Sequence, residues 1–391
     1  MRAPTLSTLL AKFSAAADVD PARAVRMWSE ISGHPDWPGS ATRVRLSALN
    51  DLAAAYSGSG DHERAIAAAE DALAATPPDD PDHPYRQSCL AERIAARYAA
   101  TGHEPDLTRL VAVRRAAVDS TAGEDPDLVV RLSALADAYR TRWWATEDAT
   151  ALTTAVQALE TAEATAGSFG ADPARTAGNL AVVLADRFEA TGDDADLDAA
   201  LDAVARARDA SPAGHPDRGT HLLLHATLLS DRYDHGGRLA DLHDAIAIAY
   251  ATLDEPLDDD RELARLQNLL GLLELDGNQV EGNARRLDVA VNWARAATAT
   301  TDAADPELAG YLTNLGAAHR LAFEATLAEI DWSTPEDVEA DVTGLRAALD
   351  GPPQAPDQPR GRTPRRRPGL ARRGRARRGD RSARRGSRYD G

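Results

Sequence analysis

An internal repeat constrains this chain more than any other feature of its sequence. Steps of 45 residues land on leucine at five of six positions, and the next residue is always Ala or Gly. Repeats of about 20 to 50 residues indicate a supersecondary unit that cannot bury its apolar stripe alone, so neighbouring units stack and bury it between them. The column consists of Leu90, Leu135, Leu180, His225, Leu270 and Leu315.

Each repeat divides into two helices. The apolar positions of a repeat lie three, four and seven residues apart, which is the spacing of one helix face. Gly stands between the two apolar runs, where it separates the helices, and Pro stands between successive repeats, where it can end one helix or begin the next. A second column marks the second helix, at Leu107, Leu152, Leu197, Leu242 and Leu287. The sequence therefore predicts an all-α fold, an α-solenoid of stacked helical hairpins.

Three segments follow along the chain. Residues 1–33 are expected to form a helical cap, with Pro21 at the start of its second helix, because end units must present one solvated side. Residues 34–349 are expected to form the repeat array, with about seven hairpins. Residues 350–391 have no apolar periodicity and are expected to be a disordered tail.

Two places in the array depart from the pattern. The sixth repeat carries Asp276, Gly277 and Asn278 where other repeats have an aromatic residue, which predicts a shorter first helix or a bend there. The last repeat has a longer connection to its final helix, which is expected from Pro335 to Leu349.

The tail differs in charge from the rest of the chain. Residues 351–391 hold fourteen Arg and three Asp, a net of +11, so with −18 for the whole chain residues 1–350 carry −29. Three interpretations stay open: an out-of-frame or truncated gene product, an arm that is solvated or folds back on the acidic array, or a nucleic-acid-binding arm. The single Lys, Lys12, beside 43 Arg marks a GC-rich gene and favours the first.

The composition of the chain indicates its cellular compartment. One Cys permits no internal disulfide, and no apolar run is long enough for a membrane span, so a cytoplasmic protein is expected. The N-terminal apolar run is interrupted by Lys12, which argues against a signal peptide.

Three segments resemble the tetratricopeptide repeat (TPR) arrays of high-GC Gram-positive bacteria, where similar runs precede a caspase-like peptidase domain of the CHAT type. They are LTNLGAAHRLAFEA, LADRFEATGDDADLDAALD and ASPAGHPDR. The resemblance covers roughly residues 34–349 and implies a right-handed superhelix that wraps a protein or peptide in a concave groove. It does not carry over the peptidase, because no His or Cys follows His319.

Candidate catalytic and metal-binding groups are few, so no enzyme activity, cofactor or metal is expected. Lys12 lacks the glycine loop of a phosphate site. Cys89 has no neighbour that would lower its pKa and is interpreted as structural. His221 and His225 share a helix face and could ligate a metal, but His225 occupies the leucine column, so a buried His is the favoured interpretation.

A row of arginines precedes the aromatic column, at Arg97, Arg142, Arg187 and Arg232. The favoured interpretation is a ladder in which each Arg pairs with an acid of a neighbouring repeat. The alternative is a row of anchors for an acidic peptide.

The TPR resemblance also places partner-contacting positions on the first helices. Asn at this face often hydrogen-bonds the backbone of a partner in that family, so Asn179 and Asn314 are the strongest candidates. The full set implied is Glu92, Asp137, Arg140, Arg175, Asn179, Asn268, Asn314 and Arg320.

The function predicted from sequence is a non-catalytic scaffold that binds a protein or peptide in the groove. One alternative is the regulatory TPR portion of a CHAT-type peptidase or signalling system whose effector domain is absent. Another is a nucleic-acid-associated protein that uses residues 351–391. The identity of the partner and the oligomeric state are not written in the sequence.

Overall fold

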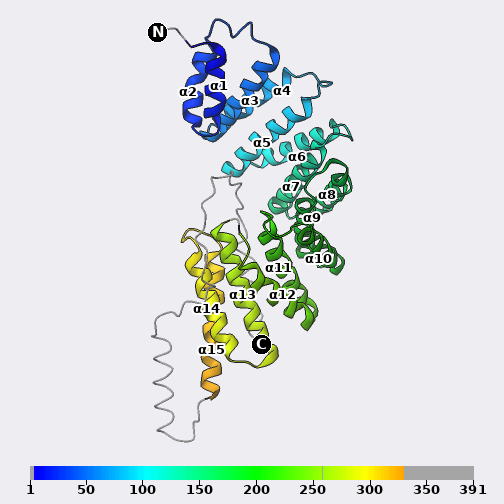
Figure 1. Cartoon of the computed structure of the whole chain (residues 1–391), viewed down its shortest axis with the longest axis vertical. Coiled ribbons are helices and arrows are strands. Elements are labelled where there is room, and N and C mark those ends of the chain that lie inside the picture. Colours follow the sequence, from blue (N-terminus) through cyan, green and yellow to red (C-terminus); the bar gives the residue numbers. More distant parts are fainter. Residues whose placement is uncertain (1–3, 258, 330–391) are drawn as a thin grey trace. The chain divides into compact units, whose positions relative to one another are not determined.

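The computed structural model describes residues 4–257 and 259–329, and every regular element within them is an α-helix. This confirms the predicted all-α fold. The helices are α1 (Leu6–Ala17), α2 (Pro21–Ser32), α3 (Thr42–Gly58), α4 (His62–Ala74), α5 (His83–Thr101), α6 (Glu104–Asp119), α7 (Asp127–Thr146), α8 (Ala149–Phe169), α9 (Pro173–Thr191), α10 (Asp194–Asp209), α11 (Arg218–Gly236), α12 (Leu239–Thr252), α13 (Asp260–Glu281), α14 (Arg285–Thr300) and α15 (Leu308–Glu329) (Figure 1).

The chain forms two compact units, Met1–Asp196 and Leu197–Gly391. In the first unit, consecutive helices pack on one another from α1 to α9, and the first helices of neighbouring hairpins also touch, α3 with α5 and α7 with α9. In the second unit, α11 to α15 pack in the same consecutive way, with α11 against α13 and α13 against α15. Each unit is thus a stack of helical hairpins, as predicted.

The repeated columns form the core between the hairpins. Leu90, Leu135, Leu180 and Leu270 are buried, and so are the small residues that follow them. Small residues let helices approach closely: a Cβ added at Gly271 would lie 3.4 Å from the carbonyl oxygen of Ala290 in α14. Each fully buried leucine contributes about 1.5 to 3 kcal/mol to folding, so the columns dominate the stability of a stack.

Helix termini follow local sequence signals. Asp20 caps α2 by accepting a hydrogen bond from the Arg23 amide, and Pro21 is the first helical residue, as predicted. The turn inside most hairpins is a glycine in the left-handed region, with φ between 64° and 72° at Gly102, Gly192, Gly237 and Gly282. In α7 the same position is Glu147, at φ 57°.

The prediction of a shorter first helix in the sixth repeat is wrong. Helix α13 runs for 22 residues through Asp276, Gly277 and Asn278. The glycine serves packing, because a Cβ at Gly277 would lie 2.9 Å from Nη1 of Arg286. Gly277 stands at the position of the arginine column, so loss of that arginine makes room for the Arg286 side chain. The final helix Pro335–Leu349 and the tail 350–391 lie outside the described residues.

Candidate partner-binding face

Three arginines of the predicted ladder are tied to acids of their own hairpin. Arg97 donates from Nε to Asp106 at 2.7 Å and from Nη2 at 2.5 Å, and Arg187 and Arg232 bind Asp196 and Asp241 in the same two-point manner. The acids are almost fully buried. Hydrogen bonding to Arg97 holds the pKa of Asp106 below its usual value.

The predicted pairs of arginine and acid therefore exist, but most of the acids belong to the same repeat as the arginine and not to a neighbouring repeat. Only Arg232 also reaches a neighbouring hairpin in the described part of the chain, through Asp198 at 3.1 Å. The signal that could have found the pairs is the acid nine residues after each arginine. In the sixth repeat the pair is inverted: Arg286 stands at the acid position of α14 and donates to Glu274 at 2.7 Å and Glu281 at 2.8 Å.

In the second unit, the predicted partner-contacting residues largely bind one another. Asn314 of α15 is buried and donates from Nδ2 to Oδ1 of Asn268 in α13 at 2.9 Å. Arg320 is exposed and pairs with Glu324 at 3.0 Å. Further bonds join successive hairpins nearby: Thr220 in α11 bonds Glu262 in α13 at 3.1 Å, and Arg265 in α13 bonds Glu307, just before α15, at 2.6 Å. Side chains of this unit thus bridge one hairpin to the next.

In the first unit, one predicted contact residue is bonded to the next hairpin. Arg140 of α7 donates to the buried carboxylate of Asp186 in α9, and its guanidinium lies 5.4 Å from the Trp144 ring. Arg140 therefore clamps two hairpins together.

The other predicted residues of this unit are accessible. Asp137 is exposed on α7, and Arg175 and Asn179 are exposed one turn apart on α9. Glu92 on α5 is partly exposed, with Arg93 at 3.0 Å. Each position lies on the first helix of its hairpin.

Two exposed apolar residues belong to the same face and were missed by sequence reasoning. Tyr85 on α5 is 49% exposed and Val130 on α7 is 67% exposed, one repeat apart, and Arg175 follows at the next repeat. Seven residues further along each helix stand Glu92 and Asp137, which share the same helix face. We call these six residues, Tyr85, Glu92, Val130, Asp137, Arg175 and Asn179, the open face.

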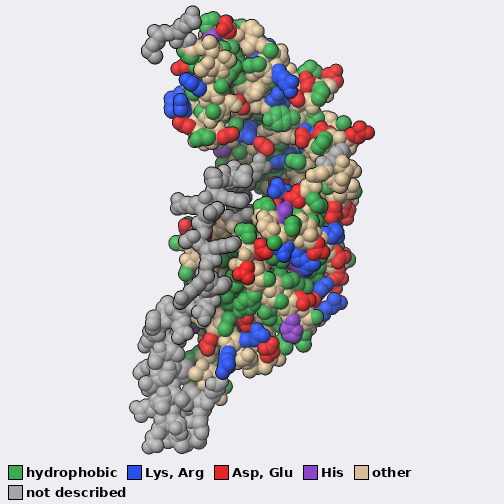
Figure 2. Space-filling model, viewed as in Figure 1, with side chains coloured by type: hydrophobic (Ala, Val, Ile, Leu, Met, Phe, Trp, Pro, Cys, Tyr) green, Lys and Arg blue, Asp and Glu red, His purple; other side chains and the backbone are tan. Residues whose placement is uncertain are grey.

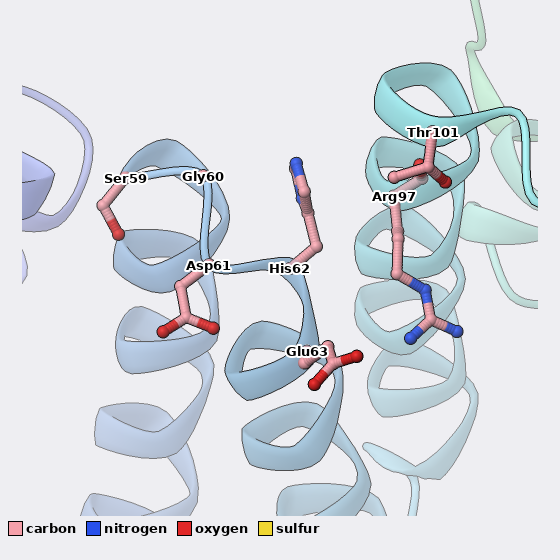
Figure 3. A pocket seen from close by; sticks show the side chains of 7 residues that line it. All are labelled: Ser59, Gly60, Asp61, His62, Glu63, Arg97 and Thr101. Atoms are coloured by element: carbon pink, nitrogen blue, oxygen red, sulfur yellow. The ribbon is translucent and has the colours of Figure 1, made fainter.

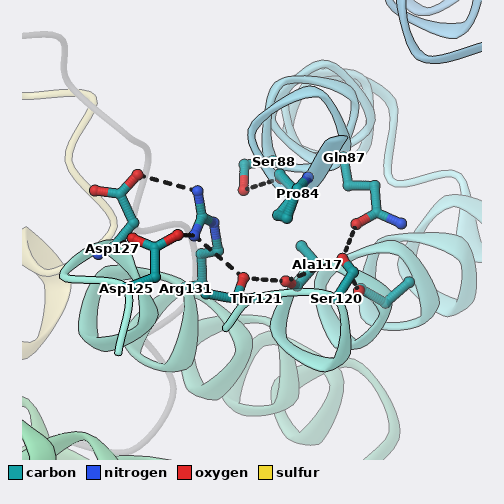
Figure 4. Close-up of polar contacts among 10 residues, drawn as sticks. Pro84, Gln87, Ser88, Ala117, Ser120, Thr121, Asp125, Asp127 and Arg131 are labelled. Carbon is teal, nitrogen blue, oxygen red and sulfur yellow. Dashed lines mark hydrogen bonds and ion pairs between the residues drawn. The ribbon is translucent and has the colours of Figure 1, made fainter. Parts of the chain in front are cut away.

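A cavity of about 420 Å³ adjoins the open face. It is lined from α3, α5 and α7 and their preceding loops, with Tyr85 at its wall. Arg131 is buried there and bonds Asp125 at 3.1 Å, Asp127 at 3.0 Å and Thr121 at 3.1 Å (Figure 4).

The arginines near this cavity are more deeply buried than the carboxylates with which they pair. Arg86 is as deeply buried as Arg131 and lies 4.0 Å from Asp82. The carboxylates are more accessible than the arginines: side-chain exposure is 44% for Asp82 and 63% for Asp127. The solvent side of these pairs is therefore acidic.

Cys89 lies beside Asn50, which lines this cavity. The Asn50 amide lies 3.5 Å from its sulfur, and burial raises the pKa of the Cys89 thiol. A raised pKa keeps the thiolate fraction small at neutral pH, which agrees with the structural interpretation made from sequence.

A second cavity of about 520 Å³ lies at the α3–α4 turn and the end of α5 (Figure 3). Two of its lining residues are bonded within the chain: Asp61 accepts from the Arg64 amide at 3.2 Å, and Arg97 is bound to Asp106. The carboxylate of Asp61 and the guanidinium of Arg97 are therefore already engaged at this cavity.

The two histidines singled out from the sequence, His221 and His225, are both buried. Ser211 Oγ lies 2.7 Å from Nδ1 of His221, with both residues buried, and Ser211 donates to the Ala207 carbonyl at 2.7 Å. The serine hydroxyl thus has the Ala207 carbonyl as an acceptor for its proton. His225 is buried in the leucine column, as predicted, and burial lowers its pKa.

Searches for metal and membrane features give two further findings. Within residues 4–257 and 259–329, no three His, Cys, Asp or Glu side chains gather as a metal-ion site would require. In that same range, no helix has both the length and the apolar character of a membrane span. Figure 2 shows acidic and basic side chains interspersed over the visible surface.

Comparisons with known proteins give structural likeness only. No family model and no curated protein sequence matches the chain. Among solved structures, the nearly identical TPR-like repeats of a protein assigned as a kinesin light chain from Podosopora anserina share 18% identity, with a TM-score of 0.41, over 54% of this chain and 98% of that one. BtubC from P. vanneervenii shares 17% identity, with a TM-score of 0.34, over 86% of this chain and 100% of that one. Human IFIT1 shares 12%, with a TM-score of 0.25, over 82% and 83%.

Proposed function

We propose that this chain is a non-catalytic scaffold that binds an extended segment of a partner protein on the open face. The observation that carries the proposal is the exposure of Tyr85 and Val130 at equivalent positions of successive first helices. We call Tyr85 and Val130 the apolar strip, and exposed apolar surface that polar groups border marks interaction sites. Figure 2 shows apolar side chains reaching the surface between charged ones.

The border of the strip supports a ligand of particular chemistry. Asp82 and Asp127 lie beside Tyr85 and Val130, and the arginines that neutralise them are on the buried side. We infer a partner segment with an apolar side chain at the strip and basic side chains on either side. Electrostatic complementarity of this kind sets register and association rate more than affinity.

Asn179 would contribute at one end of the strip. It is exposed on α9, one turn from Arg175. An amide side chain offers both a donor and an acceptor, which suits the backbone of an extended peptide.

A comparison of equivalent positions in the two units supports binding on the open face of the first unit. Thr220 and Arg265 occupy the second unit's counterparts of Tyr85 and Val130, and both bond the next hairpin. Ligand binding at those positions would have to break existing bonds, whereas burial of Tyr85 and Val130 removes apolar surface from water.

The experiment is a quantitative affinity capture from native cells with the full chain and with a Tyr85→Ser, Val130→Ser double variant. Loss of a specific partner in the double variant, with circular dichroism unchanged, supports the proposal. The matched control is Leu239→Ser in α12, which removes an apolar side chain of similar exposure, 48%. Equal loss of the partner in the control would refute the assignment to the open face.

The single variants Asn179→Ala and Asn314→Ala then test which of the two asparagines contacts the partner. Because Asn314 is bonded to Asn268, Asn179→Ala should weaken capture and Asn314→Ala should leave it unchanged. The opposite ranking would move the binding face to the second unit.

A further inference from the structure

Arg86 of α5 is a buried cation at the wall of the cavity beside the open face. The residue is only 5% exposed, and it lines the cavity of about 420 Å³. Within residues 4–257 and 259–329, its Nε is buried and has no hydrogen-bond partner. Its ion pair with Asp82 measures 4.0 Å from Nη2, which is too long for a hydrogen bond. A buried charge without hydrogen bonds is unfavourable, so Arg86 is suited to bind an anionic group.

The equivalent arginine one repeat later shows what a satisfied side chain looks like at this position. Arg131 stands 45 residues after Arg86 and is as deeply buried, but it donates to Thr121, Asp125 and Asp127 at 3.0 to 3.1 Å (Figure 4). The sequence places the same three residue types 45 positions earlier, at Thr76, Asp80 and Asp82. There Thr76 donates to the Ala72 carbonyl and Asp80 accepts from the Asp82 amide, both at 2.8 Å. The network that closes around Arg131 is therefore open around Arg86.

The charges around the cavity define the ligand that would balance them. Its volume lies within the range of small-molecule sites, about 300 to 1,000 Å³. The charged side chains that line it are three arginines and four aspartates: Arg43, Arg86, Arg131, Asp51, Asp82, Asp125 and Asp127. Three positive and four negative charges leave a net charge of −1. A complementary ligand therefore carries one anionic group for Arg86 and a net charge of +1.

Carboxylates from three parts of the first unit are available to the cationic groups of such a ligand. Asp51 is partly buried on α3, and burial raises the pKa of its carboxyl, a shift that a neighbouring cation opposes. Asp82 precedes α5 and Asp127 begins α7, with side-chain exposures of 44% and 63%. All three line the cavity that holds Arg86.

We propose that this cavity binds a free amino acid with a cationic side chain, such as L-lysine. The ligand carboxylate would bind the guanidinium of Arg86, and its two ammonium groups would lie among the carboxylates of Asp51, Asp82 and Asp127. Charge-assisted hydrogen bonds of this kind are stronger than neutral ones. Binding needs no partner protein, so this site goes beyond the proposed scaffold function.

Isothermal titration calorimetry of the full chain at pH 7 tests the proposal with L-lysine and two analogues. Cadaverine lacks the carboxylate of lysine, and L-norleucine lacks its side-chain ammonium group. Because each analogue loses a charge-assisted contact, lysine should bind at least about tenfold more tightly than either. Absence of lysine binding, or equal affinity for cadaverine, would overturn the proposal. Equal affinity for Nα-acetyl-L-lysine would also overturn it and would assign the site to the C-terminal residue of a protein.

Variants of the chain locate the site. Arg86→Gln should weaken lysine binding at least about tenfold without weakening cadaverine binding, because cadaverine has no carboxylate. Arg64→Gln is the matched control, since it removes the same charge from an exposed position on α4 that does not line the cavity, and it should leave lysine affinity unchanged. Asp51→Asn should also weaken lysine binding, and it provides the test if circular dichroism shows that Arg86→Gln does not fold. Wild-type affinity in the folded cavity variant, or an equal loss in Arg64→Gln, would refute the assignment.

Discussion

Glu147 occupies a left-handed turn position that the equivalent hairpins fill with glycine. Its φ is 57°, and the residues one repeat before and one repeat after it are Gly102 and Gly192. A non-glycine residue in this region costs roughly 1 to 2 kcal/mol. The Glu147 carboxylate also sits at the C-terminal end of α7, where a negative charge is unfavourable by about 0.3 to 1 kcal/mol.

Glu147→Gly should therefore stabilise the first unit. Glycine removes both penalties but adds conformational entropy to the unfolded chain, which offsets about 0.5 to 1 kcal/mol. The expected net gain is about 1 kcal/mol in the free energy of unfolding. Because the chain has two units, the assay is hydrogen exchange of α7 and α8 amides, where 1.4 kcal/mol corresponds to about tenfold slower opening.

Two matched variants isolate the backbone effect. Glu147→Ala removes the charge but keeps the left-handed strain, so it should recover only the smaller, electrostatic part. Gly192→Glu introduces the strain at the equivalent position one repeat later and should destabilise by a similar amount. If Glu147→Gly were no more stable than Glu147→Ala, the reasoning from backbone conformation would be refuted.

Three further predictions concern buried polar groups. Burial lowers the pKa of His225 below 6.5 in the folded state, so the unfolded state binds the proton at higher pH than the folded state does. The second unit should therefore lose stability as pH falls below about 6.5. His225→Leu should reduce that loss, as measured by urea unfolding at pH 7.5 and 5.5, and an unchanged loss would contradict this prediction. Asp106→Asn should destabilise the first unit by about 2 to 3 kcal/mol, because it leaves Arg97 without its carboxylate, and a change below 0.5 kcal/mol in the same assay would show the pair to be unimportant. Cys89 should react with a maleimide much more slowly in the folded chain than in urea, and equal rates would contradict its burial.

The buried core could be predicted from the sequence because residues at the same column position have the same packing environment in successive repeats. Leu180 and Ala181 recur at a fixed interval and are buried, since close packing of neighbouring helices demands a large residue beside a small one. Where the column was broken, sequence alone misled: Gly277 looked like a helix breaker, but it accommodates Arg286.

Partner-contacting positions were harder to predict because they depend on what the next hairpin offers. Asn179 and Asn314 occupy the same column, yet Asn314 is buried against Asn268 while Asn179 is exposed. The exposure of Tyr85 and Val130 was not predicted because a tyrosine or valine near the start of a helix is equally consistent with a buried position. Their exposure follows from three-dimensional packing and has no signature within a single repeat.

The measurement that tests the central claim most directly is site-specific photo-crosslinking in native cells. A photoreactive phenylalanine analogue would replace Val130 or Tyr85 on the open face, or Leu239 on the second unit as a control. The account predicts that positions 130 and 85 crosslink the same partner protein and that position 239 does not. Crosslinks from position 239 alone, or an identical pattern from all three positions, would contradict it.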